Sequence, residues 1–359
     1  MVNLGLRVKM RVRLGDITKV KTGKLDANAS CINGKYPFFT CSKQSLKIDS
    51  YSYDCECVLV AGNGDLNVKY YKGKFDAYQR TYIIEDDSDG KLYMPFLYYF
   101  MENYVDELRS QAIGGVIKYI KLGNITNAII NLPSIAEQKD IVVKIKKTEN
   151  IKEKKKKQLE LLDELVKARF VEMFGEMKET TKLSRYITEL RAGKSLAGTK
   201  ICKNKVLKTG AATFGYFDKT QFKYYPEDYE PNPLHKVEDG DVIISRMNTP
   251  NLVGSCSYVY KAPKDTYYPD RLWKTIVSEN TNPIFLWHLL WQQEIRKQIK
   301  ENSFGTSGTM NNISKVKMLN IKAIDVSIEL QDQFADFVRE TDKSRLHVLS
   351  ISQLQFCLK

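Results

Sequence analysis

The chain has 359 residues, of which 43% are hydrophobic and 28% are charged. This composition supports sizeable hydrophobic cores and excludes an intrinsically disordered chain. At roughly 150 residues per domain, the length predicts two domains. Lysine and arginine number 56 against 43 aspartate and glutamate, which leaves a formal net charge of +13. The surplus favours a polyanionic partner such as nucleic acid, but it does not name a function.

Membrane, secretion and metal signals are weak in this sequence. No apolar run reaches the ~18 residues that a membrane span needs, and residues 1–16 lack the apolar segment of a secretion signal. The seven cysteines include no C-x-x-C pair, and there are three histidines, which argues against a disulfide framework and a zinc ribbon. We therefore expect a cytoplasmic protein with reduced, mostly buried thiols, no metal site and no membrane contact.

Residues 134–174 predict one long helix. The segment has no glycine or proline. Ser134 followed by Glu137 is typical of a helix N-cap, and Gly175 would end the helix. About 40 residues at 1.5 Å each span about 60 Å, which is longer than the helices of ordinary domains. The lysine-rich run 152–157 is typical of a solvated face. Residues with helical spacing form the seam: Ile141, Ile145, Thr148, Leu159, Leu162 and Val166.

Residues 327–359 predict a second, shorter helix of the same kind, again without glycine or proline. Two long amphipathic helices, each marginal alone, would bury their stripes against each other. The stripe of the second helix is Phe334, Phe337, Thr341, Ser344, Val348, Ile351, Gln355 and Leu358.

The segments before and between these helices look like two copies of one domain. Six short matches occur in the same order, which is hard to assign to chance. The pattern predicts domain, long helix, domain, long helix, with bounds 1–133, 134–175, 176–326 and 327–359. The matched pairs are 14–24 with 183–194, 53–60 with 237–244, 79–84 with 270–277, 97–100 with 286–289, 112–116 with 303–309, and 135–138 with 328–331.

This arrangement resembles the specificity (S) subunit of type I restriction–modification systems, over essentially the whole chain. Five phrases carry the resemblance, and together they are fairly specific. They are 130–138 (INLPSIAEQ), 161–165 (LLDEL), 170–175 (FVEMFG), 240–246 (GDVIISR), and 305–310 (GTSGTM) followed by Ile313 and Ser314.

The resemblance implies an α+β fold with two globular target-recognition domains in a pseudo-twofold inverted repeat, separated by two long antiparallel coiled-coil helices. It implies a non-catalytic subunit that reads a bipartite, asymmetric site in double-stranded DNA and docks two methyltransferase (modification) subunits, which restriction subunits can join. S-adenosylmethionine, ATP and Mg²⁺ would belong to those partners, and no cofactor to this chain. A spacer of about 60 Å corresponds to under two turns of B-DNA at ~34 Å per turn. The short second helix departs from the family pattern.

The residues that touch DNA have to be chosen by chemistry, because the resemblance does not supply them. Phosphate contacts favour lysine, arginine and backbone N–H groups, and base edges favour arginine, asparagine, glutamine, serine and threonine. In the first domain, residues 67–74 suit a hairpin along the phosphate backbone, or equally a solvated turn, and Arg80 could equally form a structural ion pair. The candidates there are Lys69, Tyr70, Lys72, Lys74, Gln79 and Arg80.

Three segments of the second domain offer similar chemistry. A loop after an apolar strand, a long polar loop whose N–H groups could meet phosphate, and the glycine-bearing segment 208–216 are the candidates. Their side chains are, in that order, Arg246, Asn248, Thr249 and Asn251; Thr306, Ser307, Thr309 and Asn311; and Lys208 and Thr213.

Enzyme alternatives find little support. A DNA methyltransferase with a built-in recognition domain would need F-x-G-x-G and N/D-P-P-F/Y motifs, but 282–285 (NPIF) has isoleucine third and 304–308 (FGTSG) has its glycines misplaced. A nuclease beginning at residues 269–270 lacks the E-x-K that would complete its metal site. Residues 62–65 lack the G-K-S/T end of a Walker loop. A coiled-coil scaffold that binds protein remains open, and a salt titration of DNA binding would separate it.

Overall fold

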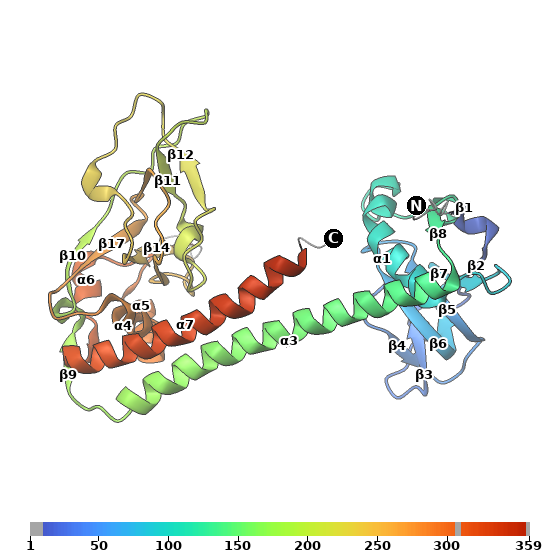
Figure 1. The fold of residues 1–359 in the computed structure, drawn as a ribbon, viewed down its shortest axis with the longest axis horizontal. Helices are drawn as coiled ribbons and strands as arrows, with labels where there is room; N and C mark the ends of the chain where they lie inside the picture. Colours follow the sequence, from blue (N-terminus) through green and yellow to red (C-terminus); the bar gives the residue numbers. More distant parts are fainter. Residues whose placement is uncertain (1–9, 306–309, 357–359) are drawn as a thin grey trace, which may run out of the picture. The chain divides into compact units, whose positions relative to one another are not determined.

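The computed structural model describes residues 10–305 and 310–356, with side chains up to residue 345. The chain divides into two compact units, unit 1 (residues 1–154) and unit 2 (residues 155–359). The long helix α3 (Ile135–Phe174) begins in unit 1 and ends in unit 2. Figure 1 shows both units, with helices drawn as coils and strands as arrows.

Unit 1 is built on a six-stranded sheet in the order β2-β7-β5-β6-β3-β4. Neighbouring strands are antiparallel except for β3 and β6, which are parallel. The strands are β2 (Thr18–Thr22), β3 (Tyr36–Phe39), β4 (Leu46–Ile48), β5 (Tyr53–Ala61), β6 (Val68–Ala77) and β7 (Thr81–Asp86).

Two hydrophobic cores form because β5 is apolar on both faces. Val58 and Val60 pack with the buried side of helix α1 (Met94–Gln111), whereas Cys57 and Leu59 pack with Phe75 on the other side. Successive residues of a strand point to opposite faces, so one strand serves both cores. A short helix α2 (Leu122–Thr126) leads into β8 (Ile129–Leu132), which pairs with β1 (Met10–Arg13) just before α3 begins.

Unit 2 contains a four-stranded antiparallel sheet in the order β10-β17-β13-β15. Its strands are β10 (Ile187–Arg191), β13 (Val242–Ser245), β15 (Cys256–Tyr258) and β17 (Leu272–Val277). A three-stranded sheet holds β11 (Lys205–Leu207) between β12 (Phe222–Tyr224) and β16 (Thr266–Tyr267). Two small pairs are β14 (Met247–Asn248) with β18 (Asn311–Asn312), and β9 (Thr180–Lys182) with β19 (Lys322–Ile324). The helices are α4 (Pro283–Leu290), α5 (Gln293–Asn302), α6 (Lys315–Leu319) and α7 (Ile328–Phe356).

The matched sequence segments adopt matching local structures. Unit 1 has the strand order β2-β7-β5 and unit 2 has β10-β17-β13. The backbone N–H of Leu14 donates to the carbonyl of Ala128 at 2.9 Å, and that of Leu183 donates to the carbonyl of Ile321, also at 2.9 Å. In each unit the small two-stranded sheet next to this bond precedes a long helix.

The ends of α3 follow from local chemistry. Ser134 and Glu137 form a capping box: the Ser134 N–H donates to Glu137 Oε2 at 3.0 Å, and the Glu137 N–H donates to Ser134 Oγ at 3.4 Å. At the other end the Gly175 N–H donates to the Val171 carbonyl at 2.7 Å. A cap at one end and a glycine just after the other therefore bound the helix, as predicted.

The two long helices contact each other within unit 2, and Figure 1 shows them side by side. The rings of Phe170 and Phe334 meet edge to face, with centroids 5.3 Å apart. Farther along, Arg345 of α7 forms an ion pair with Asp163 of α3. The contact moves toward lower numbers on α3 as it moves toward higher numbers on α7, so the helices are antiparallel there. The predicted stripe of α7 is wrong at Ser344, which is exposed, while Val338 and Thr341 are buried.

Candidate nucleic-acid interface

Strand β13 delivers the first loop with DNA-reading chemistry. The strand is fully buried and ends at Ser245, so the chain emerges at Arg246. Residues Met247–Asn248 form β14 and pair with β18, which places Asn248 opposite Asn311. The structure therefore brings together two segments that the sequence offered separately.

The polar groups of this loop are partly held and partly exposed. The Arg246 guanidinium lies over the Trp273 ring at 5.7 Å, and its Nε donates to Asn312 Oδ1 at 3.4 Å. Asn248 Oδ1 accepts from the Thr249 N–H at 2.9 Å. Both Thr249 and Asn251 are exposed. Stacking and one long hydrogen bond orient the Arg246 side chain, and its terminal N–H groups are strong donors for a base edge or a phosphate.

Helix α5 adds two basic residues that sequence reasoning missed. Arg296 donates from Nη2 to the Asn251 carbonyl at 3.1 Å, and Lys300 donates from Nζ to Asn251 Oδ1 at 3.3 Å. Burial lowers the pKa of Arg296, whose guanidinium also lies over the Trp291 ring at 5.2 Å. The signal was the spacing of isoleucines on α5, where Ile295 and Ile299 are buried. That spacing fixes which charged side chains face outward.

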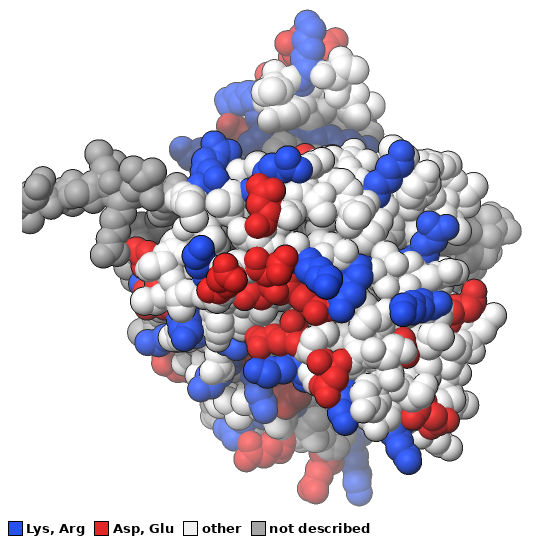
Figure 2. All heavy atoms as spheres, turned by 90° about the vertical axis from the view of Figure 1, so that its right-hand side faces the viewer, with Lys and Arg blue, Asp and Glu red and all other residues white. Residues whose placement is uncertain are grey.

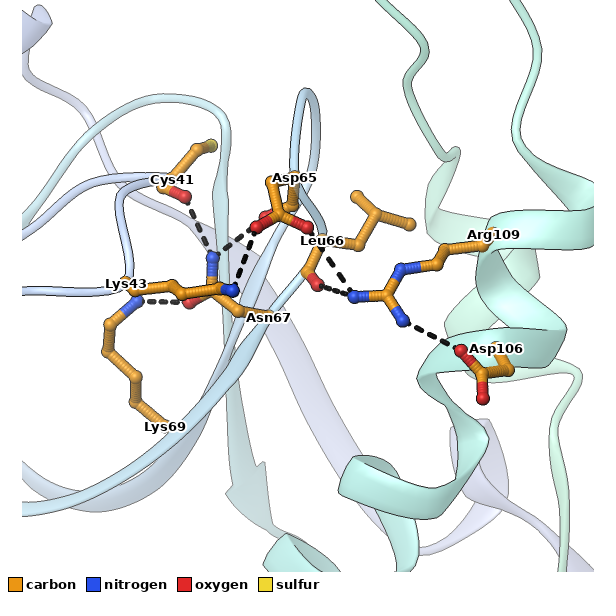
Figure 3. A network of polar contacts seen from close by, with 8 residues as sticks. All are labelled: Cys41, Lys43, Asp65, Leu66, Asn67, Lys69, Asp106 and Arg109. Atoms are coloured by element: carbon orange, nitrogen blue, oxygen red, sulfur yellow. Dashed lines mark hydrogen bonds and ion pairs between the residues drawn. The ribbon is translucent and has the colours of Figure 1, made fainter. Parts of the chain in front are cut away.

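In unit 1, the loop between β5 and β6 (residues 62–67) follows a buried strand, as the loop with Arg246 follows β13 in unit 2. Figure 3 shows the polar contacts around this loop. Arg109 of α1 donates from Nη2 to the Leu66 carbonyl at 3.0 Å, and Lys43 pairs with Asp65 at 3.3 Å. Asn67 donates to the Cys41 carbonyl at 2.8 Å. In the sequence, residues 62–65 were considered only as a rejected Walker loop, and Asn67 only as the start of the candidate hairpin 67–74. A helix arginine holds a loop carbonyl in both units.

The expected hairpin at residues 67–74 is wrong in its details. Most of that segment lies in strand β6, and the turn is the preceding loop 62–67. Tyr70 donates to Glu56 Oε1 at 2.8 Å, and Lys72 pairs with Glu56 at 3.1 Å. One glutamate on β5 therefore holds two of the residues proposed to touch DNA.

The remaining candidates of unit 1 divide between two places. Lys69 donates to Asn67 beside the loop, and burial lowers the pKa of its ammonium. The Arg80 carbonyl accepts from the Gly62 N–H at 2.8 Å, so the exposed turn with Gln79 and Arg80 adjoins the same loop. Lys74 lies elsewhere, with its ammonium 4.6 Å from the centre of the Tyr51 ring.

Comparison with known proteins decides the family. Residues 8–161 match the family model "Type I restriction modification DNA specificity domain". The chain is 40% identical over 156 residues to the EcoDI specificity subunit of Escherichia coli, a match that covers 44% of this chain and 34% of that relative. Residues 8–161 therefore belong to the type I restriction–modification DNA specificity family, and the chain is similar to specificity subunits of such systems. The resemblance found in the sequence is therefore confirmed.

Two further similar proteins match most of this chain. It is 23% identical over 367 residues to the MjaVIII specificity subunit of Methanocaldococcus jannaschii, covering 92% of this chain and 85% of that one. The crystal structure of a type I S subunit from M. genitalium has a TM-score of 0.62 at 15% identity, covering 97% of this chain and 93% of that one. The α+β fold class is confirmed by this likeness. Subunits of this family are the non-catalytic component of the type I enzyme.

The remaining candidates in unit 2 differ from one another in exposure and in hydrogen bonding. Lys208 is exposed just before a short 3-10 helix (Thr209–Ala212). Thr213 is 7% exposed and donates to the Thr209 carbonyl at 3.0 Å, so this geometry does not favour it as a DNA contact. Asn311 donates to Ser303 Oγ at 3.0 Å beside the β13 loop. Thr306, Ser307 and Thr309 lie outside the described residues.

Charged side chains of both signs are distributed over the face drawn in Figure 2. Basic and acidic side chains are interspersed there, with a group of acidic side chains near its middle. The net charge of +13 therefore does not form one continuous patch on that face. On that face, therefore, charge alone does not mark a surface for phosphate contact.

The described part of the structure gives no support to a metal site or a membrane-spanning helix. Within residues 10–305 and 310–356, no group of three or more His, Cys, Asp and Glu side chains could hold a metal ion. No helix among these residues is long and apolar enough to cross a membrane. The six described cysteines are free thiols, but only Cys57 and Cys256 are buried, so the expectation of mostly buried thiols is wrong.

Proposed function

We propose that this subunit binds double-stranded DNA at a bipartite, asymmetric site, with each unit reading one half-site. The reading loops are residues 62–67 of unit 1 and residues 246–251 of unit 2. One observation carries the proposal: an arginine from a helix, Arg109 or Arg296, holds the carbonyl of each loop at 3.0 or 3.1 Å. Base readout needs side chains on a fixed backbone, and these contacts supply such a backbone.

The two units are, in this proposal, copies of one target-recognition domain. Matching strand orders and the matching bonds at Leu14 and Leu183 support common descent. We infer domain bounds of 1–133 and 176–326, with long helices at 134–175 and 327–359. An inverted arrangement of the two domains stays a prediction.

The partners and cofactors follow from the same proposal. Two methyltransferase subunits would dock on the long helices and methylate adenine from S-adenosylmethionine. Restriction subunits using ATP and Mg²⁺ can join that complex. This chain would supply DNA recognition and would bind none of these cofactors.

A methylome tests the proposal. The chain is expressed together with its neighbouring methyltransferase in a strain that lacks adenine methylation, and single molecules are sequenced for modified bases. We expect a motif of two short half-sites with a fixed unspecified gap, present only when this chain is present. A continuous motif that does not depend on this chain would contradict the proposal.

Salt dependence separates DNA reading from a protein scaffold. Phosphate contacts release counterions, so the logarithm of the DNA-binding constant should fall linearly with the logarithm of salt concentration, by about 0.9 per phosphate neutralised. The measurement is fluorescence anisotropy of a labelled duplex carrying the methylome motif, titrated with the purified complex at several salt concentrations. Binding that is insensitive to salt would favour the scaffold.

A further inference from the structure

A buried glutamine lies at the same position of each long helix. Gln138 is the fourth residue of α3, Gln331 is the fourth residue of α7, and both side chains are 0% exposed. A primary amide has two donors and one acceptor oxygen, so burial requires partners for all three. Both glutamines find them within their own unit.

Gln138 joins α3 to the beginning of α1. Its Oε1 accepts from the N–H of Tyr93, the N-cap of α1, at 2.8 Å. Its Nε2 donates to the carbonyl of Lys91, two residues earlier, and to that of Pro133, each at 2.8 Å. The amide therefore bridges the first turn of the long helix and the first turn of the domain helix.

Gln331 makes the same three contacts in unit 2. Its Oε1 accepts from the N–H of Asn282, the N-cap of α4, at 3.0 Å. Its Nε2 donates to the carbonyl of Asn280, two residues earlier, at 3.3 Å, and to that of Val326 at 2.8 Å. In both units, Oε1 accepts from the N-cap residue of the domain helix, and Nε2 donates to the carbonyls of the residue two positions before that N-cap and the residue five positions before the glutamine. Close packing of the two helices alone would not require the same three hydrogen bonds in both units.

These contacts lie on a continuous path to the reading loops. In unit 1, Gln138 holds the beginning of α1, and Arg109 near the end of α1 holds the Leu66 carbonyl. In unit 2, Gln331 holds the beginning of α4, which precedes α5 and its Arg296. Each loop is thus tied to the long helix that begins in its own unit, through α1 in unit 1 and through the successive helices α4 and α5 in unit 2.

We propose that Gln138 and Gln331 are positioning residues that fix each recognition domain on its long helix, and thereby fix the length of the gap between the two half-sites. The inference rests on the proposed bipartite reading. One base pair is about 3.4 Å along the duplex. A joint that lost its three hydrogen bonds would admit neighbouring gap lengths while leaving the base contacts of each loop intact.

The test measures gap selectivity in the assembled complex. Gln138→Met and Gln331→Met keep the side-chain length and remove the hydrogen bonds. Gln158→Met on α3 and Gln333→Met on α7 are the matched controls, because both glutamines are exposed. Methylation rates are compared on duplexes carrying the methylome motif with its native gap, and with the gap one base pair shorter or longer.

We expect wild type and both controls to modify only the native gap. Discrimination against the altered gaps should fall about tenfold or more in each of the two variants, since net hydrogen-bond energies near 1 kcal/mol each add to more than the 1.4 kcal/mol of a tenfold change. The half-site sequences should stay the same. Should a Met variant fail to assemble, the Gln→Glu variant, which keeps the acceptor oxygen, is measured in its place with the same expectation.

Three results would overturn the inference. Equal loss of methylation at all gap lengths would make the glutamines merely structural. Unchanged gap selectivity in both variants would show that other contacts fix the joint. Absence of a bipartite motif in the wild type would instead refute the proposed function, and the inference with it.

Discussion

At the scale of single residues, unit 2 contains a buried ion pair between Lys274 and Asp241. The ammonium of Lys274 lies 3.2 Å from Asp241 and also pairs with Glu238, and the side chains of Lys274 and Asp241 are 8% and 9% exposed. Burial raises the pKa of Asp241, an effect that the lysine opposes. Removing Lys274 would leave the Asp241 carboxylate buried without its cation.

Lys274→Met should therefore lower the free energy of unfolding of unit 2 by about 3–5 kcal/mol. The double variant Lys274→Met with Asp241→Leu should recover part of that loss, because no buried charge remains. Lys200→Met is the control, since Lys200 forms an exposed pair with Glu227 at 3.1 Å and should cost at most about 1 kcal/mol. Urea unfolding measures all three, and equal losses in Lys274→Met and Lys200→Met would refute the argument.

His288 predicts a pH dependence. Burial, with Arg345 nearby, lowers the pKa of His288 to about 3, and its buried Nε2 finds no hydrogen-bond partner among the residues that the structure describes. The unfolded chain, with an ordinary pKa near 6.5, binds the proton first, so stability is lost as pH falls below that value. Between pH 7.5 and pH 5 this histidine should remove about 2 kcal/mol of the free energy of unfolding. His288→Gln should flatten this part of the stability–pH curve, and an unchanged slope would contradict the assignment.

Single contacts were only partly predictable. The loop with Arg246 and Asn248 was chosen from sequence because groove-reading side chains follow an apolar strand, and its contact with DNA stays a prediction. The contacts of Lys72 and Tyr70 with Glu56 could not be predicted, because only the register of β5 and β6 brings Glu56 opposite Lys72 and within reach of Tyr70. Cross-strand register depends on the hydrophobic pattern and on the turn geometry, so the polar residues alone did not indicate which of them would meet.

At the scale of elements, the long helices were the most predictable part of the fold. Strong local signals, a capping box and a following glycine, bound α3 at Ile135 and Phe174. The contact face of α7 was harder, since Ser344 was expected in the seam and is exposed. A strict heptad-like rhythm drifts from the 3.6-residue turn of a straight helix by ~20° per heptad, so the stripe moves around the helix.

The contact between α3 and α7 gives a test at this scale. Phe334 is 0% exposed, and its ring centre lies 5.3 Å from that of Phe170 and 5.7 Å from that of Phe174. Phe334→Ala should lower the unfolding free energy by about 3–5 kcal/mol. Leu161→Ala on α3 is the control, because Leu161 is 52% exposed and should cost less than about 1 kcal/mol. Thermal unfolding compares them, and a small loss for Phe334→Ala would show that the helices do not depend on this contact.

At the scale of the whole molecule, the order domain, helix, domain, helix stays a prediction, based on six matched sequence segments that keep their order in the chain. The strand orders β2-β7-β5 and β10-β17-β13 agree with that reading. The loop at residues 62–67 escaped notice because its chemistry is modest in sequence. The loop became a candidate because Arg109 of α1, 43 residues after Leu66 in the sequence, donates a hydrogen bond to the Leu66 carbonyl.

The central claim is that two units read two half-sites independently. The most direct measurement is the methylome of the double variant Arg246→Ala with Asn248→Ala, coexpressed with the methyltransferase. We predict that one half-site loses selectivity at one or more positions, while the other half-site and the gap remain as in wild type. Each lost base contact should cost about 1–3 kcal/mol of discrimination. A motif in which both half-sites relax together, or in which neither changes, would contradict the account.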